Sequence, residues 1–257
     1  MNNDEKQDYD KMNWLYNAFY GDMETEQLQQ LEFIENHKNL LQSYTDKEVY
    51  ILDSACGNGV KAIALALNGY NVTATDISSE MVKFANEFSK KYNVSISTDV
   101  KSWSELPSVF EPQFDIVFNI GNSIVHSPNA VTRENDISSL VQVLKRKGTL
   151  VIETRNWEKI LTENKRFTVY DKISYLDKEY IPMYHWKFNG IEQESEVEIL
   201  FQEIWKDNHV ELYENSLSFT PFTHMSLLDI MKKLGLDIIK DTFHKECDWY
   251  LIYGRKA

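Results

Sequence analysis

An apolar stretch that runs directly into an acid and a glycine turn is the feature that most constrains the fold of this chain. Residues 49–52 are followed by Asp53, by Gly57 and Gly59, and by a helical apolar pattern over 60–67. This order predicts a buried strand, a tight turn in which glycines adopt positive φ, and a helix that begins at the turn. Since the first N–H groups of a helix are unpaired and its N-terminus carries positive potential, a ligand can lie against the main chain here.

A second acid, Asp76, follows the next expected strand, residues 71–75. A carboxylate at this position can accept hydrogen bonds from both hydroxyls of a ribose. The strand, glycine turn, helix, strand and acid therefore predict a cofactor that contains a nucleoside, bound at the carboxyl ends of parallel strands.

Two such cofactors are NAD and S-adenosylmethionine. The spacing Gly57-x-Gly59-x-x-Ala62 matches the loose dinucleotide pattern, which is weak when it stands alone. Asp53 favours S-adenosylmethionine, because an acid beside the turn repels a pyrophosphate but attracts sulfonium and ammonium groups. A glycine turn without a ligand is the remaining interpretation, and Asp76 argues against it.

The composition permits one large domain, or one domain with an insertion, since 257 residues with 42% hydrophobic content can bury a sizeable core. Acidic residues outnumber basic ones by 40 to 27, and the net charge of −13 disfavours nucleic acid and anionic membranes as partners. Two cysteines, Cys56 and Cys247, imply no disulfide framework. The polar N-terminal stretch and the lack of an apolar run of ~18 residues predict a cytoplasmic protein with no signal peptide or membrane span.

Apolar strands alternate with helical patterns over most of the chain, which predicts an α/β, doubly wound, Rossmann-like sheet. A helix over 24–44 is expected before it, and strands 236–243 and 248–255 are expected to close it as an antiparallel hairpin. The other expected elements are strands at 48–53, 71–75, 94–98, 114–120 and 149–154, with helices at about 58–68, after Ser78 or Ser79, at 133–146, and at 221–235 capped by Thr223.

The alternation breaks over 165–216, where short aromatic strands predict a small antiparallel sheet inserted over the cleft. Its aromatic rings would exclude water and present π faces to a methylammonium group, although most are expected to form the insert's own core. The domain prediction is a helical cap at 1–45, a cofactor-binding core at 46–164, this inserted lid, and the end of the core sheet at 217–257. The expected strands of the insert are 167–170, 180–186, 196–201 and 210–213.

Polar side chains that directly follow the central strands are expected to face the cleft. Asn122, after strand 114–120, offers both a donor and an acceptor. Arg155 follows strand 149–154, where an unpaired cation is costly. Its partner is either a protein carboxylate such as Glu153 or a substrate carboxylate, which a guanidinium holds in a bidentate fork.

Three further side chains are candidates, and two of them have more than one interpretation. Trp103, after the third strand, is either a stacking face for the cofactor's adenine or ordinary core. His126 is either catalytic or, as we favour, a structural histidine with satisfied hydrogen bonds. Tyr20, next to Gly21, can reach into a neighbouring cleft.

Three segments together resemble the glycine N-methyltransferase and glycine/sarcosine N-methyltransferase family, which belongs to the class I methyltransferases. The segments are Tyr20-Gly21-Asp22, residues 121–126 (GNSIVH) and residues 153–160 (ETRNWEKI), and the resemblance extends from about Tyr9 to the C-terminus. It implies S-adenosylmethionine as cofactor. It also implies that Arg155 binds the carboxylate of glycine, that Asn122 contacts the substrate and that Trp103 lies near adenine.

The chain departs from this family at two places. Animal members carry arginines just after the Gly-Asp pair, one of which holds the methionyl carboxylate of the cofactor, whereas residues 23–26 here are Met-Glu-Thr-Glu. The group that holds that carboxylate is therefore unassigned. Phe219-Thr220 replaces a tyrosine that often precedes the last helix, which leaves the choice of amine open.

We therefore predict an N-methyltransferase of glycine and sarcosine that yields sarcosine and dimethylglycine in betaine synthesis. The amine attacks the S-methyl carbon in line, orientation contributes up to ~7–11 kcal/mol, and no dedicated base is assigned. The alternatives are methylation of another small amine (dimethylglycine or an amino sugar), a nicotinamide oxidoreductase, and a regulator that binds S-adenosylmethionine without turnover. No metal site is predicted and the oligomeric state is left open.

The predicted catalytic residues are Tyr20, Asn122 and Arg155. The predicted cofactor-binding residues are Asp53, Ala55, Gly57, Gly59, Asp76, Ile77, Met81, Ser102, Trp103 and Ile120.

Overall fold

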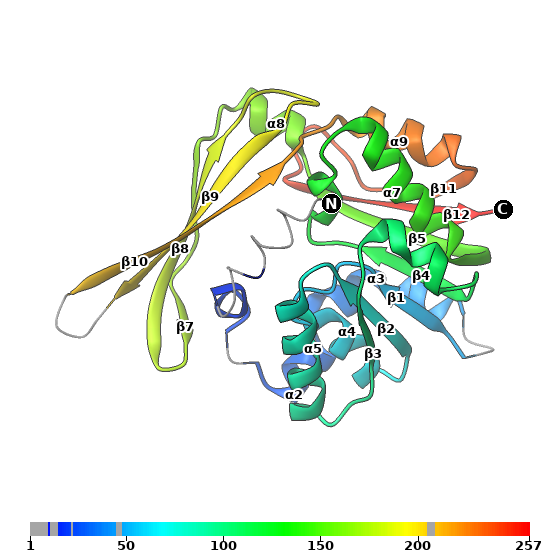
Figure 1. Cartoon of the computed structure of the whole chain (residues 1–257), viewed down its shortest axis with the longest axis horizontal. Helices are drawn as coiled ribbons and strands as arrows, with labels where there is room; N and C mark the ends of the chain where they lie inside the picture. Colours follow the sequence, from blue (N-terminus) through cyan, green and yellow to red (C-terminus); the bar gives the residue numbers. More distant parts are fainter. Residues whose placement is uncertain (1–9, 11–14, 22, 45–47, 205–208) are drawn as a thin grey trace.

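Two β-sheets organise the computed structural model, which describes residues 10, 15–21, 23–44, 48–204 and 209–257. The first is a seven-stranded sheet in the order β11-β12-β5-β4-β1-β2-β3. The second is an antiparallel sheet in the order β10-β9-β8-β6, in which β7 also pairs with β8. Figure 1 shows the second sheet extending away from one side of the first, with the long strands β9 and β10 projecting outward.

The central sheet is doubly wound, as predicted. Strands β1 to β5 are parallel, whereas β12 runs antiparallel to β5 and to β11. The chain winds outward from β1 in both directions, so the switch point lies between β1 and β4, where a crevice forms at the carboxyl ends of the strands. The strands are β1 (Tyr50–Asp53), β2 (Asn71–Asp76), β3 (Ser97–Val100), β4 (Phe114–Asn119), β5 (Leu144–Arg155), β11 (Leu236–Asp241) and β12 (Trp249–Lys256).

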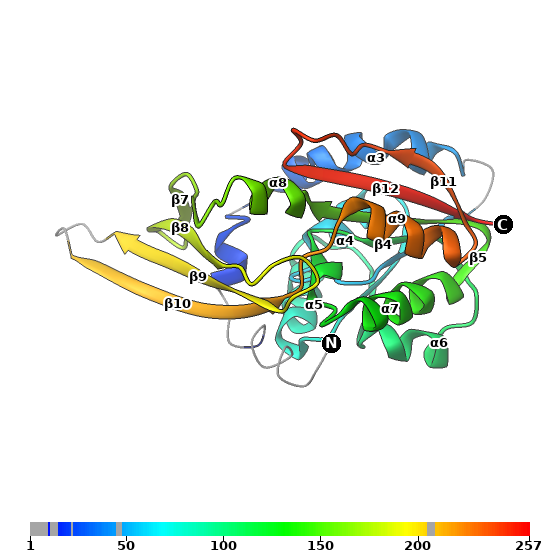
Figure 2. The ribbon, with the colours of Figure 1, turned by 90° about the horizontal axis from the view of Figure 1, so that it is seen from above.

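Helices cover both faces of this sheet, and Figure 2 shows α3 and α7 on opposite sides of the strands. Along β4, Ile116 and Phe118 pack with side chains of α3 and α4, whereas Phe114 and Val117 pack with side chains of α6, α7 and α9. Strand β4 is therefore buried on both faces, as its apolar run predicted. The helices are α2 (Thr25–Gln29), α3 (Glu32–Gln42), α4 (Val60–Leu67), α5 (Ser79–Lys91), α6 (Leu106–Val109), α7 (Ala130–Gln142), α8 (Trp157–Thr162) and α9 (His224–Lys233), with short 3-10 turns η1 (Trp103–Glu105) and η2 (Ser123–His126).

Side-chain caps determine where the long helices begin. Ser78 caps α5 and Thr223 caps α9, as predicted, and Asn129 caps α7. In each case the side-chain oxygen accepts a backbone N–H of the first turn, which otherwise has no partner within the helix.

The predicted helix 133–146 is wrong at both ends, because α7 begins at Ala130 and ends at Gln142. The carbonyl of Val143 accepts the N–H groups of Gln113 and Phe114, so the chain has already joined the edge of β4 at that point. Strand β5 begins one residue later and is correspondingly longer than predicted. Tertiary pairing thus overrides the local helical pattern here.

Two other predicted boundaries also differ from the structure. The third strand lies later than the predicted 94–98, because its pairing with β2 starts where Thr73 faces Ser97. The predicted helix 24–44 is divided into α2 and α3 at Leu31, whose ψ of 133° is extended rather than helical.

The inserted antiparallel sheet is present. Its strands β8, β9 and β10 are longer than predicted, whereas β6 ends one residue before the predicted 167–170. Strand β7 lies outside the predicted strands. Along β9, buried and half-buried side chains alternate over the whole strand, so one face packs inward. Phe201 on that face packs edge-on against Phe19, with ring centroids 4.8 Å apart. The strands are β6 (Phe167–Val169), β7 (Ile173–Tyr175), β8 (Lys178–Lys187), β9 (Ser195–Ile204) and β10 (Val210–Phe219).

Over the described residues, none of the helices has both the length and the apolar character needed to cross a membrane.

Candidate active site

A cavity of about 700 Å³ opens where the carboxyl ends of the central strands face the second sheet. The turns after β1, β2, β3, β4 and β5 form one side of it, and side chains of β8, β9 and β10 form the other. A volume of this size is typical of a small-molecule site.

The glycine turn takes the conformation that its sequence predicted, with φ of 53° at Gly57 and 83° at Gly59. The two glycines serve different contacts. A Cβ added to Gly57 would lie 2.7 Å from the hydroxyl of Tyr16, at the cavity, whereas one added to Gly59 would lie 2.7 Å from the Cβ of Ala85 in α5. Gly57 therefore lets the Tyr16 ring pack against the turn, and Gly59 allows α4 and α5 to pack closely.

Asp76, at the end of β2, is held by the main chain. Its carboxylate accepts the N–H of Gly57 at 2.8 Å and the N–H of Ser78 at 2.9 Å. Burial raises the pKa of Asp76 to about 6, and these hydrogen bonds oppose the rise. Each carboxylate oxygen keeps a further lone pair, so Asp76 can still accept the hydroxyls of a ribose.

Asp53, at the end of β1, is buried without a hydrogen-bond partner for either carboxylate oxygen among the described residues. The backbone N–H of Ala55 lies close enough to lower its pKa slightly, but burial dominates and raises the pKa of Asp53 to about 6. A buried carboxylate without donors is costly, so this position suits a cationic ligand. The ammonium group of a methionyl moiety fits that requirement.

Trp103 lies on the cavity wall with Ser102, and its indole is 3% exposed. The indole N–H donates to the backbone carbonyl of Ser54 at 2.7 Å, which fixes the ring beside the glycine turn. Trp103 is therefore part of the core, and its contact with the cofactor's adenine stays a prediction.

Arg155, at the end of β5, lies within an aromatic cluster. Its guanidinium lies over the rings of Trp249 at 4.3 Å and Trp186 at 5.4 Å, and it donates to the hydroxyl of Tyr170 at 3.0 Å. Glu153, the protein carboxylate considered as a partner, instead accepts the N–H of Gly121 at 2.9 Å. Among the described residues, no carboxylate lies within ion-pair distance of Arg155.

Asn122 connects the loops after β4 and β5. Its side-chain oxygen accepts the hydroxyl of Thr154 at 2.9 Å and the N–H of Arg155 at 3.1 Å. The oxygen is thus committed to the protein, and the amide nitrogen is the group that can donate to a ligand.

His126 lines the cavity but takes the structural role that we favoured. Its Nδ1 lies 2.7 Å from the carbonyl of Ser218 in β10, and burial lowers the pKa of His126 to about 4. The imidazole is therefore neutral near pH 7, and it is too weak a base at that pH to deprotonate an amine.

Aromatic residues that were not predicted as site residues also line the cavity. Tyr16 packs against Tyr20, with ring centroids 5.7 Å apart. Tyr184 lies beside Arg155, and burial raises the pKa of its phenol far above the usual value. The alternation of β8 is the signal that places Tyr184 and Trp186 on one face, but the sequence does not show that this face meets the cavity.

The structure brings most of the predicted site residues together. Those that line the cavity are Tyr20, Ala55, Gly57, Asp76, Ile77, Ser102, Trp103, Asn122 and Arg155. The remaining four are packed behind the cavity surface and are Asp53, Gly59, Met81 and Ile120.

The fold and the strand-end acids define a class I methyltransferase architecture, and comparisons with solved structures agree. A methyltransferase from Clostridium acetobutylicum superposes with a TM-score of 0.72 at 14% identity, covering 96% of both chains. CalS10, described as an amino pentose methyltransferase with bound S-adenosylmethionine, superposes with a TM-score of 0.72 at 11% identity, covering 95% of this chain and 97% of that one.

Comparison by sequence agrees with this architecture. Residues 51–148 match the family described as "Methyltransferase domain". The cofactor that the domain and the fold support is S-adenosylmethionine, in agreement with Asp53.

Curated relatives carry the predicted resemblance. The chain is 31% identical over 113 residues to glycine/sarcosine N-methyltransferase of Aphanothece halophytica and 30% identical over 125 residues to glycine N-methyltransferase of Homo sapiens. The matches cover 44% of this chain and 43% and 42% of the two relatives, so the chain spans less than half the length of the curated relatives it matches.

Proposed function

We propose that this protein is an S-adenosylmethionine-dependent N-methyltransferase whose acceptors are glycine and sarcosine. The observation that carries the proposal is Arg155, a guanidinium at the cavity for which the described residues supply no carboxylate. The amide of Asn122 lies next to it, and the two together offer the donors that an amino-acid carboxylate requires. The names of the curated relatives support the same substrate class.

The chain's part in the reaction is to position and desolvate the reactants. When bound, the cofactor supplies the methyl group and a neutral sulfur leaving group, so no acid is needed to expel it. Asp76 holds the ribose, and the charge of the buried Asp53 attracts the ammonium. Arg155 holds the acceptor's carboxylate so that the acceptor's nitrogen can be in line with the methyl group. Such orientation is worth up to ~7–11 kcal/mol.

The aromatic wall contributed by β8 completes the site. Tyr184 and Trp186 exclude water from Arg155, which strengthens its attraction for a carboxylate. Because the raised pKa of Tyr184 keeps its phenol protonated near pH 7, this hydroxyl donates hydrogen bonds and does not remove the amine's proton. The acceptor therefore enters as the neutral amine, and Tyr20 is proposed to stabilise the methyl group.

Two rivals remain and make different predictions. An amino-sugar acceptor, suggested by the name of CalS10, would leave Arg155 without an anionic partner. A regulator would bind the cofactor without turnover.

We also propose a cytoplasmic location, in line with the free, buried cysteines Cys56 and Cys247. The proposed products are sarcosine and dimethylglycine, which enter betaine synthesis.

The test is kcat/KM for glycine, sarcosine, dimethylglycine and ethanolamine at saturating S-adenosylmethionine. We expect glycine and sarcosine to react well, dimethylglycine poorly because it has no N–H left to orient, and ethanolamine at least ~10²-fold more slowly because it leaves Arg155 unpaired. Equal rates with ethanolamine and glycine would refute the carboxylate clamp. Cofactor binding without any methylated product would favour the regulator.

A further inference from the structure

The site described above leaves the cofactor's methionyl carboxylate without an assigned partner. Three lysines or arginines line the cavity among the described residues, namely Lys61, Lys101 and Arg155. Each of them has different neighbours, so their surroundings distinguish their roles.

Two of the three cations have neighbours that assign them to roles other than binding the methionyl carboxylate. Arg155 lies in the aromatic cluster at the end of β5 and is proposed to hold the acceptor. Lys101 follows β3, beside Trp103, and lies 3.7 Å from the carboxylate of Asp99. The adenosine expected at this end is neutral and does not require a cation.

Lys61 lies at the glycine turn, in the first turn of α4, with a side chain that is 23% exposed. Its ammonium reaches the loop after β4, because a Cβ added to Gly121 would lie 3.5 Å from Nζ. Its one ion pair among the described residues, with Glu153, is long at 3.9 Å, and Glu153 is already engaged by the N–H of Gly121. The described residues place no hydrogen-bond acceptor on Lys61 Nζ, so its donors are available to a ligand.

Two buried acceptors flank the same end of the cavity. Asp53 lies behind the cavity surface, and the charge of Lys61 is close enough to lower its pKa. His37, on α3, donates Nδ1–H to the carbonyl of Phe33 at 2.8 Å, which leaves Nε2 as an acceptor that is buried and unpartnered. With Glu153, this end thus combines one cation and two carboxylates, which suits a ligand group that carries one carboxylate and a larger positive charge, as the methionyl end of S-adenosylmethionine does.

We propose that Lys61 Nζ binds the α-carboxylate of the cofactor's methionyl group, while the charge of the buried Asp53 attracts the α-ammonium from behind the cavity wall. The inference rests on the proposed use of S-adenosylmethionine, but it does not depend on which acceptor is methylated. Lys61 is a positioning residue, since it anchors the methionyl end and thereby places the S-methyl group in the cavity.

The test compares two ligands that differ only by this carboxylate, S-adenosylmethionine and decarboxylated S-adenosylmethionine, by calorimetry on the full chain. In Lys61→Met, the Kd of S-adenosylmethionine should rise by about 10-fold or more, while the Kd of the decarboxylated ligand stays within about 2-fold. Lys61→Arg should restore most of the affinity. Lys61→Gln, which keeps the polarity, is the second variant should Lys61→Met not fold.

Lys101→Met is the matched control, because the Lys101 side chain is 24% exposed in the same cavity. It should affect the two ligands equally. Equal losses for both ligands in Lys61→Met, or no loss for either, would overturn the assignment of Lys61. If the unmutated chain binds neither ligand, the proposed function fails as well, so the two failures are distinguishable.

Discussion

At the scale of single residues, the site depends on charges that are costly to bury. Asp53 and Asp115 are both almost fully buried acids of adjacent strands, 2% and 1% exposed. Asp115 has the ammonium of Lys145 at 2.8 Å, whereas Asp53 has no hydrogen-bond donor among the described residues. Asp115 therefore stabilises the fold through its ion pair, whereas Asp53 is proposed to interact with a ligand.

Asp53→Asn is therefore expected to stabilise the ligand-free protein at pH 7 and to weaken its binding of S-adenosylmethionine. The pKa of Asp53 in the folded protein, about 6, lies above the ordinary 3.8, so the folded state binds the proton more tightly than the unfolded state does. The buried charge therefore destabilises the folded protein above pH 6, and this destabilisation disappears as the pH falls toward 4. Removing the charge should raise the free energy of unfolding by about 1–3 kcal/mol at pH 7.

Urea unfolding at pH 7 and pH 5, with calorimetry of the cofactor, measures both effects. Asp115→Asn is the control and should destabilise the protein, since it removes the partner of Lys145. A destabilised Asp53→Asn protein with unchanged cofactor affinity would show that Asp53 is structural.

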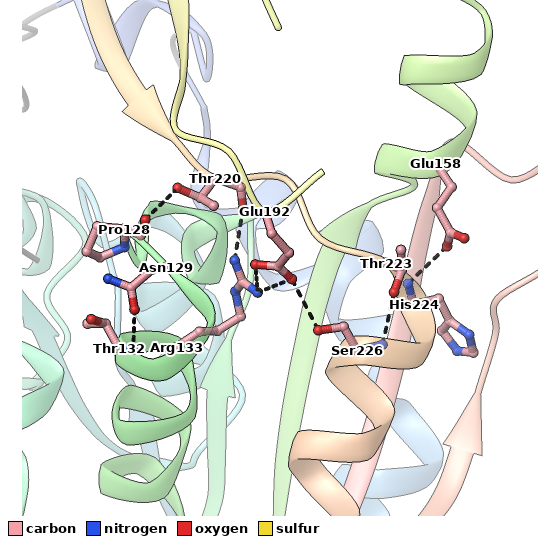
Figure 3. A network of polar contacts seen from close by, with 10 residues as sticks. All are labelled: Pro128, Asn129, Thr132, Arg133, Glu158, Glu192, Thr220, Thr223, His224 and Ser226. Carbon is pink, nitrogen blue, oxygen red and sulfur yellow. Dashed lines mark hydrogen bonds and ion pairs between the residues drawn. The ribbon is translucent and has the colours of Figure 1, made fainter. Parts of the chain in front are cut away.

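At the scale of elements, one of the contacts that join the second sheet to the core involves a buried cation. Arg133 of α7 is fully buried and forms two hydrogen bonds with Glu192, at 2.9 and 3.0 Å, and one with the carbonyl of Thr220 at 3.1 Å. Figure 3 shows Glu192, from the connection between β8 and β9, reaching both Arg133 and Ser226 of α9. The contact joins the hairpin that carries Tyr184 to two helices of the core.

Glu192→Gln should lower the free energy of unfolding by about 1–3 kcal/mol, because it leaves the buried Arg133 without its anion. Glu134→Gln is the matched control, since Glu134 has the same 33% side-chain exposure but pairs with the exposed Lys233, and its loss should cost less than about 1 kcal/mol. Urea unfolding gives both values. Similar losses in the two variants would mean that the buried pair is no stronger than a surface pair.

The sequence predicted the elements of the core better than their ends. Strands such as β4 are continuous apolar runs that only a sheet covered on both faces can bury, so their position follows from the pattern. The start of β5 does not follow from the pattern. Residues 143–144 continue a helical pattern in the sequence, and they lie outside α7 because they pair with β4. The hairpin of β7 lies outside the predicted strands for a similar reason, since it adds to the edge of β8.

At the scale of the whole molecule, the site is predictable where the topology alone places a residue. Parallel strands bring their carboxyl ends together, so the spacing of Asp53, Asp76 and Arg155 along the chain was sufficient. Lys61 and Tyr184 were not predicted as site residues, because their positions depend on how α4 and the second sheet meet the cavity. Asp22, in one of the segments that carry the resemblance, lies outside the described residues.

The two sheets form one cavity in which Arg155 of the core meets aromatic rings of the inserted sheet, and we propose that Arg155 binds an acceptor's carboxylate there. The most direct measurement is the KM of glycine and the Kd of S-adenosylhomocysteine for Arg155→Lys. Lysine keeps the charge but loses the bidentate fork, so KM should rise about 10-fold or more while Kd is unchanged. An equal loss of cofactor affinity, or an unchanged KM, would contradict the claim and make Arg155 a structural residue of the aromatic cluster.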